Sequence, residues 1–538
     1  MNNIKETGLL RCKDKLIVDQ NGKPFLLRGL GLGGWLVKEG YMLHSVAASP
    51  TTIELAITDL IGKKGYQEFN QAYEQNYVNE NDIKAIADFG LNSIRLPFSY
   101  KMLSLKRGQY LESGFKVIDQ VIEWCKKYNL YLILDMHCAP GSQNGQNISD
   151  GDIDKEAKLF TKKKKYQPWT IEIWQEIARR YVKEDVIAGY DLINEPVLPE
   201  GITMQDLRDF YIDLTKAIRE IDTRHIIFIE GDWYSTKFDG LAPKWDDNMA
   251  YSFHKYWNPT DVESIRDRAL DLREQTNAPI WMGESGENTN HWFYETIKLL
   301  EDHQIGWNWW THKKVSNLTN PYSAKIGKYY QKILDYWRLK GPRPTKSEAK
   351  KGFMELAENL KLENCHFFKD VVSAICDLSG LEKSKPYGDN TLPKLIKCVD
   401  YDIGANNVAY YVKYAKRDDH RMRRVFNSGR KYRNDPIHIF EEKGNYVVGL
   451  FEDGQWLKYT LNSPSSEEYE VILKFRGSGK IRVEVNGQSN VVNLNAVNYK
   501  TKSLGTFSLN RGDNPFYLHV EKNGLFISEL EFKKVVKE

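Results

Sequence analysis

The chain has few cysteines, no long apolar run and no excess of charge of either sign over its 538 residues. The 6 cysteines lack the paired short spacing of a zinc site or a redox motif, so we expect buried thiols. No stretch approaches the roughly 20 apolar residues that a membrane helix needs, which excludes a membrane span. The formal net charge is only +3, so no field is present to attract a polyanion, and nucleic acid is not expected as a partner.

The N-terminus also lacks the apolar core and the small-residue cleavage site of an export signal. We expect an extracellular or periplasmic protein whose signal has been replaced by Met1, with a cytoplasmic protein as the alternative.

What the sequence does contain is an alternation of short apolar runs with longer amphipathic stretches, which is typical of βα units around a parallel sheet. Eight runs are present, the number that closes a (β/α)₈ TIM barrel. The predicted strands are 25–32, 93–99, 131–137, 188–195, 225–231, 250–256, 279–284 and 306–310.

Helical spacing of apolar residues supports this α/β fold class and sets the predicted domain boundaries. A helix is predicted over 112–129, and a hairpin over 9–18, followed by the turn Asn21-Gly22, is expected to cap the closed end of the barrel. The barrel is placed at 1–344, because a Gly-Pro-Arg-Pro segment ends its last helix. Residues 345–394 are predicted as a helical linker. Residues 395–538 show alternating strands and regular turns, which predict a β-sandwich of jelly-roll type.

Reactive groups of a TIM barrel lie at the carboxyl ends of its strands, so the residues there are candidates for a site. Hydrolysis of an acetal needs one proton donor and one carboxylate facing the anomeric carbon, and Glu195 and Glu284 supply both. Their strands lie on opposing sides of the barrel, which could bring the carboxyls to roughly 5 Å, the separation for a retaining mechanism. The candidates at strand ends are Arg95, His137, Asn194, Glu195, His254, Tyr256, Glu284 and Trp310.

These residues stand in motifs that resemble the signature of glycoside hydrolase family 5. The motifs are IRLP, DMH, NEP, HKY, GES and the strand-eight Trp310. By that resemblance Glu195 would be the acid/base and Glu284 the nucleophile, while Arg95 and Tyr256 would hydrogen-bond Glu284 and hold it ionised. The other residues would bind the sugar: Asn194 at its 2-hydroxyl, Trp310 as an apolar floor, with Trp309 as the competing choice, and His137 and His254 by ordering the pocket. The mechanism implies no catalytic cofactor and no metal.

Two glycine-rich segments, 33–39 and 139–145, are similar to the exo-β-1,3-glucanase branch of that family. Glu39 would then bind hydroxyls of a terminal glucose. We therefore expect a monomeric hydrolase of β-glucan, with exo-β-1,3-glucanase action ahead of endo-β-1,4-glucanase action. A non-catalytic carbohydrate-binding protein is the rival of another class. A lyase or aldolase would want a buried lysine at a strand end, and the sequence suggests none.

The predicted C-terminal domain resembles carbohydrate-binding module families 6 and 35. The resemblance rests on VDYDIGANNVAYY, YRNDPIHI and GLFEDGQWLKYTLN, and Trp456 and Tyr432 are its candidate sugar-binding aromatics. Those modules often begin with EAEDY, where this chain has Cys398-Val399-Asp400-Tyr401. A structural calcium in this domain is therefore left open.

Overall fold

The computed structural model describes residues 4–45, 48–413 and 429–536. They form two compact units. The first comprises Met1–Tyr256, Asp261–Gly286 and Leu299–Phe367, and the second comprises Trp257–Thr260, Glu287–Lys298 and Phe368–Glu538. The predicted linker 345–394 is thus divided. Helix α13 (Lys346–Asn359) belongs to the first unit, and α14 (Lys369–Cys376) and α15 (Leu378–Leu381) belong to the second.

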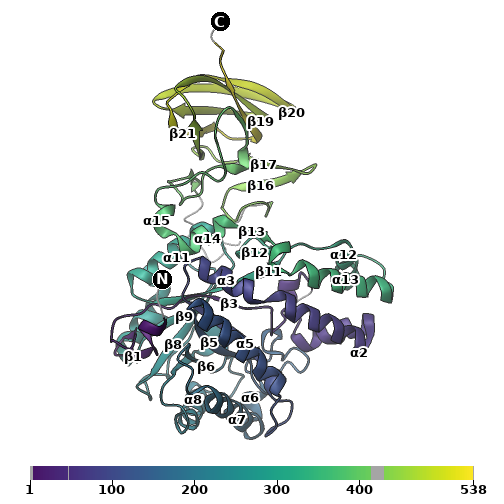
Figure 1. The fold of residues 1–538 in the computed structure, drawn as a ribbon, viewed down its shortest axis with the longest axis vertical. Coiled ribbons are helices and arrows are strands. Elements are labelled where there is room, and N and C mark those ends of the chain that lie inside the picture. The colour runs from purple at the N-terminus through teal and green to yellow at the C-terminus, as the bar shows by residue number, and fades with distance from the viewer. Residues whose placement is uncertain (1–3, 46–47, 414–428, 537–538) are drawn as a thin grey trace. The chain divides into compact units, whose positions relative to one another are not determined.

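The first unit is built around a closed barrel of parallel strands (Figure 1), which confirms the predicted α/β barrel class. Its strands are almost wholly buried, because helices cover the outer face of a parallel sheet and side chains fill its interior. In hydrogen-bonded order they are β10 (Gly306–Trp310), β3 (Arg28–Gly31), β4 (Ser93–Ser99), β5 (Tyr131–Cys138), β6 (Ile187–Asp191), β7 (Ile226–Glu230), β8 (Met249–Lys255) and β9 (Ile280–Gly286).

Helices surround these strands and follow from the apolar spacing of the sequence. Helix α5 (Glu112–Tyr128) buries the predicted apolar face and ends at Asn129, whose φ of 57° is a left-handed cap. Helix α8 (Met204–Arg219) begins with a capping box between Thr203 and Asp206. The other long helices of this unit are α2 (Pro50–Tyr77), α3 (Glu80–Asp88), α7 (Lys163–Tyr181) and α12 (Lys328–Trp337). Helix α11 (Asn290–Asp302) is divided between the two units.

A hairpin closes the amino-terminal end of the barrel, as predicted. Leu10 and Ile17 join a buried cluster with residues at the beginnings of strands, such as Tyr131 and Ile226. The predicted turn at Asn21-Gly22 is also present, after the hairpin. Strands β1 (Arg11–Lys13) and β2 (Leu16–Val18) pair Lys13 with Leu16, so the hairpin turns at residues 14–15, and Asn21-Gly22 forms the next turn along the chain.

The second unit contains a nine-stranded antiparallel sheet around its own hydrophobic core. Its central strand, β19 (Glu467–Val485), pairs with β22 (Leu525–Lys534) over its first half and with β21 (Gly512–Lys522) over its second half. The register shifts near Gly477, whose φ is 104°. One strand therefore takes part in both halves of the domain, as at the corners of orthogonal β packings.

The remaining strands of this sheet complete the antiparallel β domain that the sequence predicted. They are β14 (Lys394–Lys397), β15 (Tyr410–Tyr411), β16 (His438–Glu442), β17 (Asn445–Leu450), β18 (Trp456–Ser463) and β20 (Gln488–Leu509).

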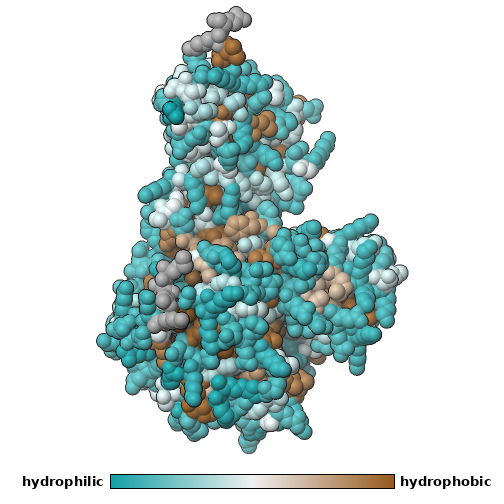
Figure 2. All heavy atoms as spheres, viewed as in Figure 1, coloured by the Kyte–Doolittle hydropathy of each residue, from teal (hydrophilic) through white to brown (hydrophobic). Residues whose placement is uncertain are grey.

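The outer surface is mainly hydrophilic on the face drawn in Figure 2. Within the described ranges, no helix combines the length and the apolar character needed to cross a membrane.

Candidate active site

The residues predicted as a site come together at the carboxyl ends of the barrel strands. Direct contacts join them into one buried network that also includes Asp135, Asp191 and Glu230. Its predicted members are Arg95 on β4, His137 on β5, Asn194 and Glu195 after β6, His254 on β8, Tyr256 after it, Glu284 on β9 and Trp310 on β10.

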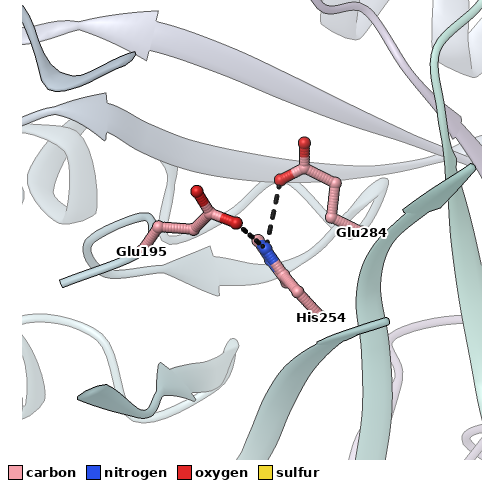
Figure 3. Close-up of side chains that lie close together, drawn as sticks. All are labelled: Glu195, His254 and Glu284. Carbon is pink, nitrogen blue, oxygen red and sulfur yellow. Dashed lines mark hydrogen bonds and ion pairs between the residues drawn. The ribbon is translucent and has the colours of Figure 1, made fainter. Parts of the chain in front are cut away.

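Glu195 and Glu284 approach each other from different strands, with His254 between them (Figure 3). Nδ1 of His254 lies 2.7 Å from Oε1 of Glu195 and 3.3 Å from Oε2 of Glu284. One ligand atom from each of the three side chains lies within 4.8 Å of the others. The two carboxyl groups are therefore close enough to act on the same bond of a substrate.

Arg95 holds several members of this network in place through hydrogen bonds. It is fully buried, and its guanidinium donates to Glu284 Oε2 at 3.3 Å, to Asn194 Oδ1 at 2.8 Å, to Asp191 Oδ2 at 2.9 Å and to Glu230 Oε1 at 3.0 Å. The planar fork of an arginine suits several fixed acceptors at once. One buried cation thus sets the position of Glu284 and of Asn194 together.

The backbone at Glu195 is held in an unusual conformation. Its φ is 46°, in the left-handed region that costs a residue other than glycine about 1–3 kcal/mol. Three hydrogen bonds fix it: the Glu195 N–H donates to Glu230 Oε2, Asn144 donates to the Glu195 carbonyl, and Gln143 donates to the Asn194 carbonyl. This conformation directs the Glu195 side chain toward Glu284 and His254.

Tyr256 donates to Glu284 Oε1 at 3.2 Å, so both carboxylate oxygens of Glu284 accept hydrogen bonds, as expected. The expectation that these donors hold the carboxyl ionised stays a prediction. Burial raises the pKa of Glu284 more than the charges of His254 and Arg95 lower it. Desolvation outweighs the two cations, because the carboxyl is almost completely enclosed.

The pKa of His254 is raised as well, but by charge rather than by burial. Burial lowers the pKa of His254, but Glu230, Glu284 and Glu195 raise it well above the ordinary histidine value. The three surrounding carboxyl groups therefore favour the cationic form of the imidazole. This gives it an electrostatic role that the sequence did not indicate, beyond ordering the pocket.

His137 and Trp310 form one wall of the site. Their rings are stacked with centroids 5.5 Å apart and an interplanar angle of 4°. Nδ1 of His137 lies 2.8 Å from Asp135 Oδ2, which fixes the imidazole. A Cβ at Gly33 would lie 2.2 Å from the Trp310 ring, so only glycine lets the loop after β3 pass over the indole. Trp309, the competing floor, is instead fully buried beside Trp307.

Glu39 lies at the end of the loop that follows β3. It is 3% exposed, and its charge is among those that raise the pKa of His137. Glu39 therefore belongs to the same electrostatic environment as the other site residues.

Sequence reasoning missed Glu230, Asp135 and Asp191. All three are fully buried, and each contacts Arg95. Glu230 ends β7. Burial alone would raise the pKa of Glu230, but His254 and Arg95 lower it to about 2. The signal that could have found it was present, since a glutamate ends the otherwise apolar run IIFIE.

The expectation that no buried lysine ends a strand was wrong. Lys255 ends β8, is fully buried, and donates through Nζ to Ser264 Oγ at 2.9 Å. Burial lowers the pKa of Lys255 to about 7. Adjacent side chains of a strand point to opposite faces, so Lys255 faces away from the interior site that His254 enters. Its position does not favour a lyase or aldolase.

Glu195, His254 and Glu284 also form a group that could hold a metal ion, and it is the single such group that the described part of the chain contains. The closeness of two carboxyl groups and an imidazole is also what acid/base and nucleophilic catalysis on an acetal requires.

A closed parallel barrel with two facing glutamates at its mouth is the arrangement of a barrel glycoside hydrolase. Residues 58–315 match the family model Cellulase (glycosyl hydrolase family 5), so this part of the chain is a domain of that family.

Three relatives match about half of this chain. A "Beta-xylosidase" of Phanerodontia chrysosporium is 33% identical over 251 residues, which are 46% of this chain and 52% of that protein. "Endoglucanase C" of Acetivibrio thermocellus is 29% identical over 315 residues, covering 46% of this chain and 88% of that protein. A "Probable glucan 1,3-beta-glucosidase A" of Aspergillus fumigatus is 27% identical over 279 residues, covering 49% and 65%. The chain thus spans about half the length of the first of these relatives.

Among solved structures, the catalytic domain of an endoglucanase of Thermobifida fusca is similar at 16% identity. The match has a TM-score of 0.40 and covers 67% of this chain and 99% of that one.

Proposed function

We propose that the protein is a retaining β-glucan hydrolase that removes glucose from chain ends, with β-1,3-glucan as its preferred substrate. Glu195 acts as acid/base and Glu284 as nucleophile in this proposal. The observation that carries it is the approach of the two carboxyl groups to within 4.8 Å across His254. That spacing leaves no room for a water between carboxyl and anomeric carbon, and favours a covalent glycosyl-enzyme over direct inversion.

The roles follow from the partners of each carboxyl. Glu284 accepts from Arg95 and Tyr256, which would stabilise a carboxylate as it is released from the glycosyl-enzyme. Glu195 is the more exposed of the pair, at 14% of its side chain against 7%. A residue that must exchange a proton with water in the second step suits that position.

Removal of single glucose units is supported by hydrogen bonds that tie the loop after β5 to the beginning of α2. Asp150, in the loop after β5, accepts from the backbone and hydroxyl of Thr51 and from Lys101. Asp152 of the same loop accepts from Ser49, which follows the loop that carries Glu39. A loop fixed in this way to the beginning of α2 would close one end of the site, as a pocket for a chain end requires.

An endo-acting β-1,4-glucanase is the second candidate, and the similarity to Endoglucanase C favours it. A non-catalytic carbohydrate-binding protein is the less favoured rival, because both carboxyl groups and their hydrogen-bond partners are present.

One digest distinguishes these functions. The full chain is incubated with laminarin, barley β-glucan, carboxymethyl cellulose, mannan and an aryl β-glucoside, and early products are sized. We expect glucose as the sole first product from laminarin. A ladder of mid-sized oligomers would replace the proposal with the endo-glucanase, and no product from any substrate would favour the binding protein.

For the C-terminal domain we propose an accessory role in carbohydrate binding. Of its two candidate aromatics, Trp456 packs edge-on against Tyr517 and remains partly exposed. Tyr432 packs against Tyr446 and donates to Asp400, so its hydroxyl is already engaged. Trp456 is therefore the better candidate for stacking on a sugar ring.

A further inference from the structure

A groove of about 560 Å³ lies between α2 and α5 on the barrel unit, and none of the proposed site residues lines it. We call it the amide groove. It is defined by three aromatic residues, Trp35, Tyr66 and Trp124, and four glutamines, Gln67, Gln71, Gln75 and Gln120.

The aromatic rings come from three separate segments of the chain. Trp35 follows β3, Tyr66 lies on α2, and Trp124 lies on α5. Trp35 is fixed, because its indole N–H donates to the Glu74 carbonyl at 2.7 Å. Tyr66 and Trp124 are partly exposed. Because Trp35 is only 4% exposed, the ring surface offered to a flat apolar face comes from Tyr66 and Trp124.

The glutamines form a row of hydrogen-bonding groups along the groove. Gln67, Gln71 and Gln75 follow one another at four-residue spacing on α2, about 6 Å apart along the helix. Gln120 adds an amide from α5. These four side chains are exposed, and none makes a side-chain hydrogen bond to another described residue. Each amide can both donate and accept.

The charge of the groove is balanced. Among the described residues that line it, Glu74 is the only carboxylate and Lys116 the only ammonium group. The Glu74 carboxylate already accepts from Asn70 at 2.8 Å. An anionic polymer or a basic peptide would therefore find no complementary field.

We propose that the amide groove binds a neutral saccharide chain as a second site, apart from the proposed active site. The choice of β-glucan as that chain rests on the proposed function. Pyranose rings present apolar C–H faces to the aromatic side chains and hydroxyl groups to the amides. A lipid or an apolar helix would cover the amides without pairing them, at a cost of about 1–3 kcal/mol for each buried group.

The groove shares a loop with the proposed active site. Lys38, next to Glu39, donates to Asn70 at 2.6 Å, and Trp35 lies three residues before Lys38. A polymer held in the groove would therefore be anchored against the same loop that carries Glu39. The expected consequence is better capture of long substrates, with no effect on short ones.

The test uses the full chain with Trp124→Ala and, separately, with Gln71→Ala and Gln75→Ala together. Each variant is compared with the native protein for hydrolysis of laminarin, barley β-glucan and an aryl β-glucoside. We expect KM for the polymers to rise about two- to tenfold, with kcat and the aryl glucoside kinetics unchanged. Gln205→Ala, an exposed amide on α8, is the matched control and should change nothing.

Binding is measured directly by retardation in native gels that contain each polymer, in a Glu284→Gln background that prevents digestion. The groove variants should be retarded less than this parent. The groove proposal is overturned if both groove variants are retarded as much as the parent and their KM for the polymers is unchanged. It is also overturned if the variants lose binding of a protein or peptide ligand while they still bind the polymers. Failure of the native protein to hydrolyse any glucan would contradict the proposed function separately. Unfolding temperatures show whether Trp124→Ala folds, and the glutamine pair keeps the test decisive if it does not.

Discussion

The backbone N–H of Glu195 donates a 2.7 Å hydrogen bond to Oε2 of Glu230, a carboxyl group on the neighbouring strand. The other oxygen of Glu230 accepts from Arg95, and His254 Nε2 lies 3.2 Å from it. Glu230 thus connects the strained backbone of the proposed acid/base to the cations that surround the proposed nucleophile. It is a positioning residue, since it is fully buried and acts through Glu195, Arg95 and His254.

Replacing Glu230 with glutamine should lower kcat about ten- to a hundredfold, because the amide retains the shape but loses a charged hydrogen bond and a charge beside His254. The pKa of His254 should fall, since Glu230 is a main cause of its raised value. Kinetics on an aryl β-glucoside across pH measure both effects. An unchanged pH profile would show a purely structural role, and Glu172→Gln, a partly exposed partner of Arg107, is the control.

Tyr256→Phe removes one donor from Glu284. A donor to the ionised form lowers a carboxyl pKa, so its loss should raise the already raised pKa of Glu284 further. The acidic limb of kcat/KM against pH should therefore move to higher pH. A limb that stays in place, or moves to lower pH, would show that Tyr256 does not stabilise the carboxylate.

Glu39→Gln tests the pocket for a chain end. Loss of one charged hydrogen bond to a terminal glucose should cost about 1.5–3 kcal/mol, or about ten- to a hundredfold in kcat/KM on laminari-oligosaccharides. The unfolding temperature should change little. Full activity of the variant would remove Glu39 from the sugar-binding residues and weaken the exo assignment.

Lys255→Met tests the buried lysine through its pH dependence. The pKa is about 7 in the folded chain against an ordinary 10.5, so between these values the unfolded state binds a proton that the folded state lacks. The free energy of unfolding of the native protein therefore rises with pH between about 7 and 10.5. Below about pH 7 the folded protein carries the full cost of burying the charged lysine. The variant should unfold several degrees higher than the native protein at about pH 6, with the difference fading toward about pH 10.

The matched control is Lys216→Met, an exposed lysine on α8. Equal gains at both pH values, or a gain in the control, would contradict the depressed pKa of Lys255.

The sequence predicted the barrel well, because buried parallel strands are continuous apolar runs that separate clearly from amphipathic helices. It also predicted the residues that stand in recognisable motifs, such as Glu195 and Glu284. Glu230 and Lys255 were not predicted, because their structural roles depend on which face of a strand they occupy. Only the closed barrel shows that Glu230 faces Arg95 and that Lys255 faces Ser264.

Hydrogen bonds between residues far apart in the chain could not be predicted from the sequence either. Thr51 and Asp150 are about a hundred residues apart in the chain, yet they tie the beginning of α2 to the loop after β5. The C-terminal domain was predicted as β structure from its turns, but the sharing of β19 between two halves depends on pairings that no local pattern specifies.

The central claim is that Glu284 is the nucleophile and Glu195 the acid/base of a retaining mechanism. It is tested most directly by azide rescue of Glu284→Ala and Glu195→Ala with a dinitrophenyl β-glucoside, whose leaving group needs no protonation. With Glu284 removed, azide enters from the face that the nucleophile occupied, so NMR should show α-glucosyl azide. With Glu195 removed, azide attacks the covalent intermediate, so the product should be β-glucosyl azide. The reverse pair of products would exchange the two roles, and no rescue of either variant would contradict the mechanism itself.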